Sequence, residues 1–158
     1  MTKIGITGHQ NLPPYSLDTV RSMIDRVLNE FDKPVTGISS LAVGADQLFA
    51  ESVLQHQGQL TALIPCQGYE ATFEAEADLN RYHGLLHKAS SVIELDYSEP
   101  SEVAFLEAGH ELVRMSDLLI AVWDGKSGGK GGTADIVAFA QSEGKPIRVL
   151  WPKNLKRE

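Results

Sequence analysis

Short apolar runs recur along the chain at intervals of about 25 to 32 residues, which suits one strand followed by one crossover helix. The clearest run, Leu118–Val122, is apolar without alternation, as expected of a parallel strand that is covered on both faces. The pattern therefore predicts a mostly parallel sheet of about six strands. The predicted strands are Lys3–Thr7, Val35–Ser39, Leu60–Ile64, Ser91–Leu95, Leu118–Val122 and Pro146–Leu150.

Apolar residues with helical spacing fill the gaps between these runs. The clearest helix follows Ser16, which is a predicted N-cap, and its apolar residues continue to Phe31. Strands that alternate with helices predict a three-layer, doubly wound α/β sandwich, with residues 1–158 forming one domain. The other predicted helices lie within Ala45–Leu54, Tyr69–Lys88, Glu102–Met115 and Thr133–Ala140.

Composition narrows the classes of protein to which the chain belongs. The 158 residues include 14 Lys and Arg against 21 Asp and Glu, which gives a formal net charge of −7. This charge makes nucleic acid an unexpected partner, because proteins that bind nucleic acid present a basic face. A single cysteine, Cys66, excludes an internal disulfide and suits a reducing compartment, so we expect a cytoplasmic protein. No apolar run of about 18 residues occurs, and we expect no membrane association.

A glycine-rich segment follows the fifth predicted strand and precedes the last helix. Five glycines fall within Gly125–Gly132, and Thr133 then stands where it can cap the helix. Glycine lets the backbone approach a ligand, and the N–H groups at a helix start attract anions. One interpretation is a phosphate cradle with Lys126 or Lys130 as the counter-charge, and the other is a flexible surface loop. The predicted phosphate contacts are Gly128, Gly129, Lys130, Gly131, Gly132 and Thr133.

Two further polar loops follow the first and second predicted strands. In a doubly wound fold, ligands bind beyond the carboxyl ends of the strands, near the point where the strand order reverses. The loops that follow these strands are therefore expected to lie with the glycine-rich segment around one site. The predicted ligand contacts in them are Gly8, His9, Gln10, Ser39, Ser40, Gly44 and Asp46.

Several single residues near these loops allow two interpretations each. Asp46 can hydrogen-bond a ribose, or it can stabilise the dipole of the helix that it opens. Trp123 and Tyr69 can stack on a base, although Trp123 suits the core equally well. Asp124 and Asp135 flank the glycine-rich segment and could divide acid and base roles in catalysis. The alternative makes Asp124 a turn former and Asp135 a first-turn helix acid.

Metal and thiol chemistry have weaker support in the sequence. His83 and His87 stand four residues apart, as zinc-binding pairs do, but no further Cys or His follows at ligand spacing. The sequence therefore predicts no metal site. Cys66 lacks an obvious base partner, and we interpret it as a small buried residue.

The segments Gly5–Gln10, Ser40–Asp46 and Asp124–Asp135 together resemble the SLOG superfamily of Rossmann-like proteins. That group includes Lonely Guy phosphoribohydrolases, the DNA-processing protein A domain and nucleotide sensors. In Lonely Guy enzymes the loop reads Pro-Gly-Gly-x-Gly-Thr and is followed by glutamates, the first of which is implicated in cleaving the N-glycosidic bond. Gly131–Thr133 matches the end of that loop, whereas Asp135 replaces the glutamate. Because an Asp is one methylene shorter, this departure argues against hydrolysis and leaves phosphate binding intact.

The resemblance implies a Rossmann-like domain that binds a nucleotide or nucleotide-derived ligand, of the mononucleotide, ADP-ribose or NAD type, as a sensor. It implies no required cofactor and a homo-oligomer, either a dimer or a larger assembly. Two alternatives stay open. One is an N-glycosidase for nucleoside 5′-monophosphates, in which Asp135 with Asp124 would act on the sugar. The other is a DNA-binding domain in the manner of DNA-processing protein A, which the net charge of −7 disfavours.

Overall fold

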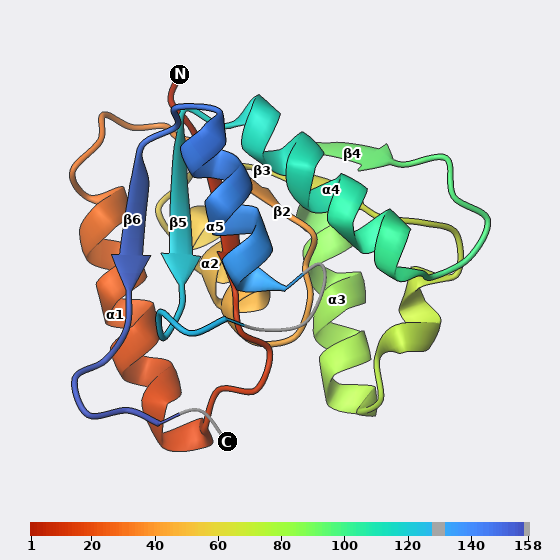
Figure 1. Cartoon of the computed structure of the whole chain (residues 1–158), viewed down its shortest axis with the longest axis horizontal. Coiled ribbons are helices and arrows are strands. Elements are labelled where there is room, and N and C mark those ends of the chain that lie inside the picture. Colours follow the sequence, from red (N-terminus) through yellow and green to blue (C-terminus); the bar gives the residue numbers. More distant parts are fainter. Residues whose placement is uncertain (128–131, 157–158) are drawn as a thin grey trace.

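A single sheet of six parallel strands runs through the part of the chain that the structure, a computed structural model, describes: residues 1–127 and 132–156. The strand order is β4-β3-β2-β1-β5-β6 (Figure 1). The fold is therefore the α/β class that the sequence predicts. The strands are β1 (Lys3–Gly8), β2 (Thr36–Ser39), β3 (Gln59–Ile64), β4 (Ser91–Glu94), β5 (Leu118–Val122) and β6 (Ile147–Leu150).

Helices cover both faces of the sheet and make it the middle of three layers. On one face, α1 and α2 pack on Ile4, Ile6 and Ile120, and α3 packs beside α2. On the other face, α4 and α5 pack on Ile38 and Leu119. Successive residues of β5 thus enter opposite layers, which explains why this strand lacks polar alternation. The helices are α1 (Leu17–Leu28), α2 (Ala45–Gln55), α3 (Glu76–Lys88), α4 (Glu102–Met115) and α5 (Thr133–Ser142), with short 3₁₀ helices η1 (Pro14–Ser16) and η2 (Tyr69–Thr72).

The predicted strands are all present: Leu118–Val122 matches β5 at both ends, and each of the others differs from the observed strand by one residue at one end. Local details differ more. Ser16 occupies the N-cap position of α1 as predicted, but its hydroxyl does not accept from the first turn of the helix and instead donates to the carbonyl of Pro13 at 2.7 Å. The predicted helix Tyr69–Lys88 is divided into η2 and α3. Thr133 is the first residue of α5 rather than its cap, and Gly132 occupies the N-cap position. None of the helices in the described residues is long and apolar enough to cross a membrane.

The strand order reverses at β1, which lies between β2 and β5. The chain builds outward from β1 to β4 on one side and then returns to add β5 and β6 on the other, so a crevice is expected beyond the carboxyl ends of β1 and β5. Gly8 ends β1 at this crevice. A Cβ atom there would lie 2.5 Å from Ala45 Cβ and 2.9 Å from Val122 Cβ, so only glycine lets the start of α2 lie this close to the sheet.

Candidate functional site

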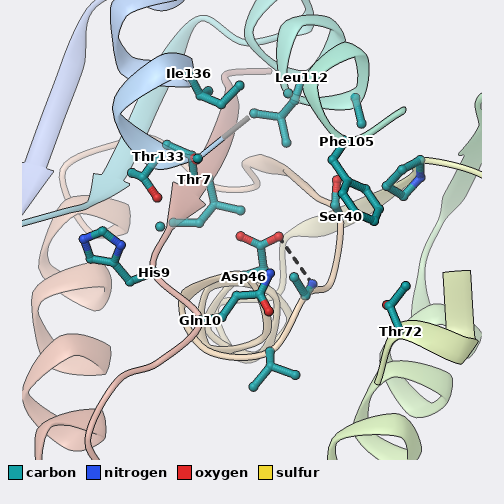
Figure 2. A pocket seen from close by; sticks show the side chains of 18 of the residues that line it. Thr7, His9, Gln10, Ser40, Asp46, Thr72, Phe105, Leu112, Thr133 and Ile136 are labelled. Atoms are coloured by element: carbon teal, nitrogen blue, oxygen red, sulfur yellow. Dashed lines mark hydrogen bonds between the residues drawn. The ribbon is translucent and has the colours of Figure 1, made fainter. Parts of the chain in front are cut away.

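A cavity of about 570 Å³ lies at the crevice, beyond the carboxyl ends of the strands (Figure 2). Its volume falls in the range of small-molecule sites. Its walls come from the loops that follow β1, β2, β3 and β5 and from one side of α4. Five of the predicted contacts in the β1 and β2 loops line it, together with two from the start of α5: Gly8, His9, Gln10, Ser40, Asp46, Gly132 and Thr133.

One end of the cavity is polar and adjoins the start of α5. Figure 2 shows Thr133 and Thr7 around the same space, with His9 nearby. Gly132 and Ala134 also line this end. A helix start carries a partial positive charge and N–H groups without partners inside the helix, and both favour an anion.

The start of α2 also faces the cavity, but its backbone is already engaged. The N–H of Ala45 donates to the carbonyl of His9 at 3.3 Å, and the N–H of Gln47 donates to the carbonyl of Ala42 at 3.2 Å. The N–H of Ala42 in turn donates to Asp46 Oδ2 at 3.3 Å. At α5 the N–H groups of Asp135 and Ile136 likewise donate to the carbonyl of Gly132, at 3.1 and 3.3 Å, while Gly132, Thr133 and Ala134 line the cavity.

Asp46 lies between the polar end and the rest of the cavity, with its carboxylate toward the open space (Figure 2). Burial raises the pKa of this carboxyl group from 3.8 to about 7, and the hydrogen bond from Ala42 opposes that rise only in part. An acid held chiefly by the dipole of α2 would have a lowered pKa instead. The carboxyl group is therefore poorly solvated, and hydroxyl donors of a ligand would stabilise its charged form.

His9 and Asp124 form a pair at the polar end. The N–H of Asp124 donates to His9 Nε2 at 3.3 Å, and Asp124 Oδ1 lies 3.3 Å from the same nitrogen. Both side chains are about 7% exposed. Asp124 Oδ1 also accepts from the N–H of Lys126 at 2.9 Å, as in the second of its two interpretations, that of a turn former. His9 lines the cavity, while Asp124 supports it from behind.

The other end of the cavity is aromatic. Tyr69 and Phe73 come from the segment that follows β3, and Phe105 comes from α4. Of these three residues, the sequence indicated only Tyr69. The segment after β3 has no glycine motif that would mark a binding loop. Phe105 fits the apolar helical spacing of Glu102–Met115, and the sequence alone therefore indicates a core residue. The strand order could have indicated Phe73 and Phe105. All strands are parallel, so the segment after β3 and the start of α4, which follows β4, lie at the same edge of the sheet as the crevice.

The remaining predicted site residues lie outside the cavity wall. Ser39 is buried beneath it, where its hydroxyl donates to the Asp46 carbonyl at 3.1 Å. Gly44 shapes the loop, with φ of +88°. Trp123 donates from Nε1 to the Lys126 carbonyl at 2.9 Å, and Asp135 is exposed on the first turn of α5. Gly128, Gly129, Lys130 and Gly131 lie outside the described residues.

No protein-family model matches the chain, and no curated protein matches it significantly. Its structure is nevertheless similar to several solved ones. DNA processing protein A from Helicobacter pylori, described for its single-stranded DNA binding mode, superposes with a TM-score of 0.70 at 22% identity, over 99% of this chain and 68% of that one. The fold is Rossmann-like.

Two other structures give the same result. DNA processing protein A (DprA) from Streptococcus pneumoniae has a TM-score of 0.71 at 18% identity, and the match covers 99% of this chain and 52% of that one. The chain thus spans about half the length of that protein. The molybdenum cofactor carrier protein from Chlamydomonas reinhardtii has a TM-score of 0.57 at 15% identity, over 96% of this chain and 77% of that one. At these identities the likeness concerns the fold.

Proposed function

We propose that this chain binds a nucleotide or nucleotide-derived ligand, of the mononucleotide, ADP-ribose or NAD type, as a binding or sensor domain. The observation that carries the proposal is the order of chemistry along one cavity. A helix start lies at one end, the Asp46 carboxylate lies in the middle, and aromatic rings lie at the other end. Phosphate, ribose and base follow one another in the same order in a nucleotide.

The phosphate is assigned to the start of α5. Thr133 supplies a hydroxyl group there, and Lys126, which is exposed at the edge of the cavity, supplies a positive charge. Anions bind such helix starts through backbone N–H groups and the helix dipole.

The ribose is assigned to Asp46. A carboxylate can accept hydrogen bonds from both hydroxyl groups of a ribose, as acidic residues do in dinucleotide-binding folds. Burial holds the pKa of Asp46 at about 7, so the charged form gains more from these bonds than an exposed aspartate would.

A ligand panel tests the proposal. The thermal unfolding midpoint is measured with AMP, GMP, CMP, NAD, ADP-ribose and ribose 5-phosphate, and every positive sample is chromatographed for free base. A ligand at about 100 times its dissociation constant adds about 2.7 kcal/mol, which shifts the midpoint by several degrees. A shift with intact ligand supports a sensor, while no shift with any compound refutes the proposal.

A matched pair of variants ties the shift to this cavity. Asp46→Asn removes the charge while keeping an acceptor for the N–H of Ala42, and we expect it to weaken nucleotide binding about tenfold. Asp18→Asn is the control, because Asp18 also lies in the first turn of a helix but is exposed on α1. Equal affinities for the two variants would remove Asp46 from the site.

N-glycosidic hydrolysis is the second candidate function, and the pKa of Asp46 favours it. A carboxyl group with a pKa of about 7 suits proton transfer at neutral pH, and this one lies inside the cavity. Asp135 is exposed and lies outside the cavity wall, so any such reaction would use Asp46 first. Release of free base from AMP by the wild type, with loss of turnover in Asp46→Asn, would establish it.

A further inference from the structure

The cavity continues past Asp46 into a region whose chemistry differs from that of the phosphate end. Pro65, Tyr69 and Phe73 form one wall, and Phe105 of α4 contributes from the other side. None of these side chains carries a charge. A second phosphate group would gain nothing here, whereas a flat, uncharged ring would gain contact on its faces.

Of the aromatic rings that line the cavity, Phe105 is the most exposed to solvent. It is 36% exposed, while Ala104 and Ala108 on the same helix are 0% and 2% exposed. The helix therefore has well-covered positions on either side of Phe105 and leaves this large aromatic ring at the cavity. A partly exposed ring that lines a small-molecule cavity is placed to contact a ligand.

The ring is held by an aromatic support. Tyr69 is 5% exposed, and its ring meets that of Phe105 edge-on, with centroids 6.3 Å apart. The Tyr69 ring also contacts Phe73 at 5.5 Å and Tyr82 at 5.5 Å. The hydroxyl of Thr72 donates to the Tyr69 carbonyl at 2.7 Å and so fixes the turn that carries this support. A wall fixed in this way loses little side-chain entropy when a ring binds.

Hydroxyl groups stand at the edge of the same space. Ser40 and Thr72 both line the cavity, and Figure 2 shows Thr72 across it from Thr133. A nitrogen-containing ring would find hydrogen-bonding partners at its edge and an aromatic surface on its face. A purely aliphatic group would use only the second of these.

We propose that Phe105, supported by Tyr69 and Phe73, forms a subsite for the planar heteroaromatic base of the ligand. The proposal rests on the proposed function, because it assigns the aromatic end of the cavity to the base once phosphate and ribose occupy the other end. Phe105 is then the residue that makes the cavity prefer a nucleotide over a sugar phosphate. Stacking tolerates any base, so Phe105 accounts for the presence of a base rather than for its identity.

The test compares two ligands on the same protein by calorimetry: the best-binding nucleoside monophosphate of AMP, GMP and CMP, and ribose 5-phosphate. We expect the wild type to bind the nucleotide about ten times more tightly than the sugar phosphate, since stacking on one aromatic ring supplies a factor of about 5 to 150. In Phe105→Leu, the ratio should fall to about threefold or less, while the affinity for ribose 5-phosphate stays unchanged. Phe105→Trp should restore the ratio, because it restores an aromatic face.

Val103→Ala is the matched control, since Val103 is 60% exposed on the same helix and is not among the cavity residues. Its two affinities should equal those of the wild type. The unfolding midpoint of each variant shows that it folds. Two results would refute the base subsite alone. Either the wild type binds the nucleotide and ribose 5-phosphate with equal affinity, or the ratio of the two affinities is unchanged in Phe105→Leu. An equal loss for both ligands in Phe105→Leu overturns it too, because the ring would then act only on the structure.

Failure of the proposed function looks different. If neither a nucleotide nor ribose 5-phosphate binds the wild type, the nucleotide site and its base subsite are both refuted. If adenosine binds as tightly as AMP and both are lost in Phe105→Leu, the base subsite is supported and the phosphate assignment is refuted.

Discussion

Two helices, α2 and α5, begin at the same edge of the sheet with similar sequences, but the aspartates in their first turns lie in different environments. α2 starts with Gly44 at the N-cap and Asp46 in its first turn, and α5 starts with Gly132 at the N-cap and Asp135 in its first turn. Asp46 lines the cavity with a pKa raised to about 7 by burial, whereas Asp135 is exposed.

The difference follows from position along each helix. Asp46 is the second residue of α2 and Asp135 is the third residue of α5, and one residue turns a side chain by about 100° around the helix axis. The two helices also cover opposite faces of the sheet. An acid in the first turn of a helix is therefore not enough to identify a site residue, because its direction relative to the crevice decides what it contacts.

The two N-cap glycines give the largest expected contrast. Gly44 has φ of +88°, and a Cβ atom there would lie 2.6 Å from the carbonyl oxygen of His9. Gly132 has φ of −80°, which any residue adopts. We expect Gly44→Ala to lower the free energy of unfolding by about 2 to 4 kcal/mol and Gly132→Ala to change it by less than about 0.5 kcal/mol. Urea unfolding measures both. A similar loss in the two variants would show that the α2 turn is not specially constrained.

The two acids should differ in how stability depends on pH. The pKa of Asp46 is raised from 3.8 to about 7 in the folded protein, so folding favours its protonated form. The stability that this group contributes is fully present below pH 3.8 and is lost as the pH rises through about 7. Asp46→Asn should therefore stabilise the protein at pH 8.5 by about 1 to 3 kcal/mol and much less at pH 5. Asp135→Asn, measured at the same two pH values, serves as the comparison.

Urea unfolding of the wild type and both variants at the two pH values checks this. A ligand should reverse the effect, because a bound ribose stabilises the charged carboxylate. If Asp46→Asn is no more stable than the wild type at pH 8.5, burial does not dominate at this carboxyl group. A gain in stability together with weaker nucleotide binding would show that Asp46 is kept for binding at the expense of stability.

The fold could be predicted from the sequence, because apolar runs and helical spacing repeat with the period of a strand and its crossover helix. The polar end of the site could be predicted as well. Gly8, His9 and Asp46 lie beside or within glycine-containing loops that end or follow strands, and the structure places all three around the cavity. These residues can be recognised in the sequence because a strand end, a tight turn and a helix start each have a local sequence pattern.

The aromatic end could not be predicted in the same way. Phe105 fits the apolar pattern of α4, and Phe73 lies in a segment without a turn motif. Their place in the cavity depends on how α4 and the segment after β3 meet across the sheet, which no local pattern encodes. Caps depend on similar detail: Ser16 occupies the N-cap position of α1 but its hydroxyl donates to Pro13 instead of capping the helix, and Thr133 lies one residue beyond the N-cap position of α5.

The smallest expected effect concerns Asp135, the residue that the Lonely Guy resemblance singles out. Because it is exposed and outside the cavity wall, we expect Asp135→Asn to lower the free energy of unfolding by about 0.3 to 1 kcal/mol, which is the worth of an acid near a helix start. Its nucleotide affinity should stay within about twofold of the wild type. Calorimetry with the best-binding ligand, run beside Asp46→Asn, decides between the two acids. A tenfold loss in Asp135→Asn would mean that the carboxylate turns toward the ligand on binding, and the functional acid would then belong to α5 rather than to α2.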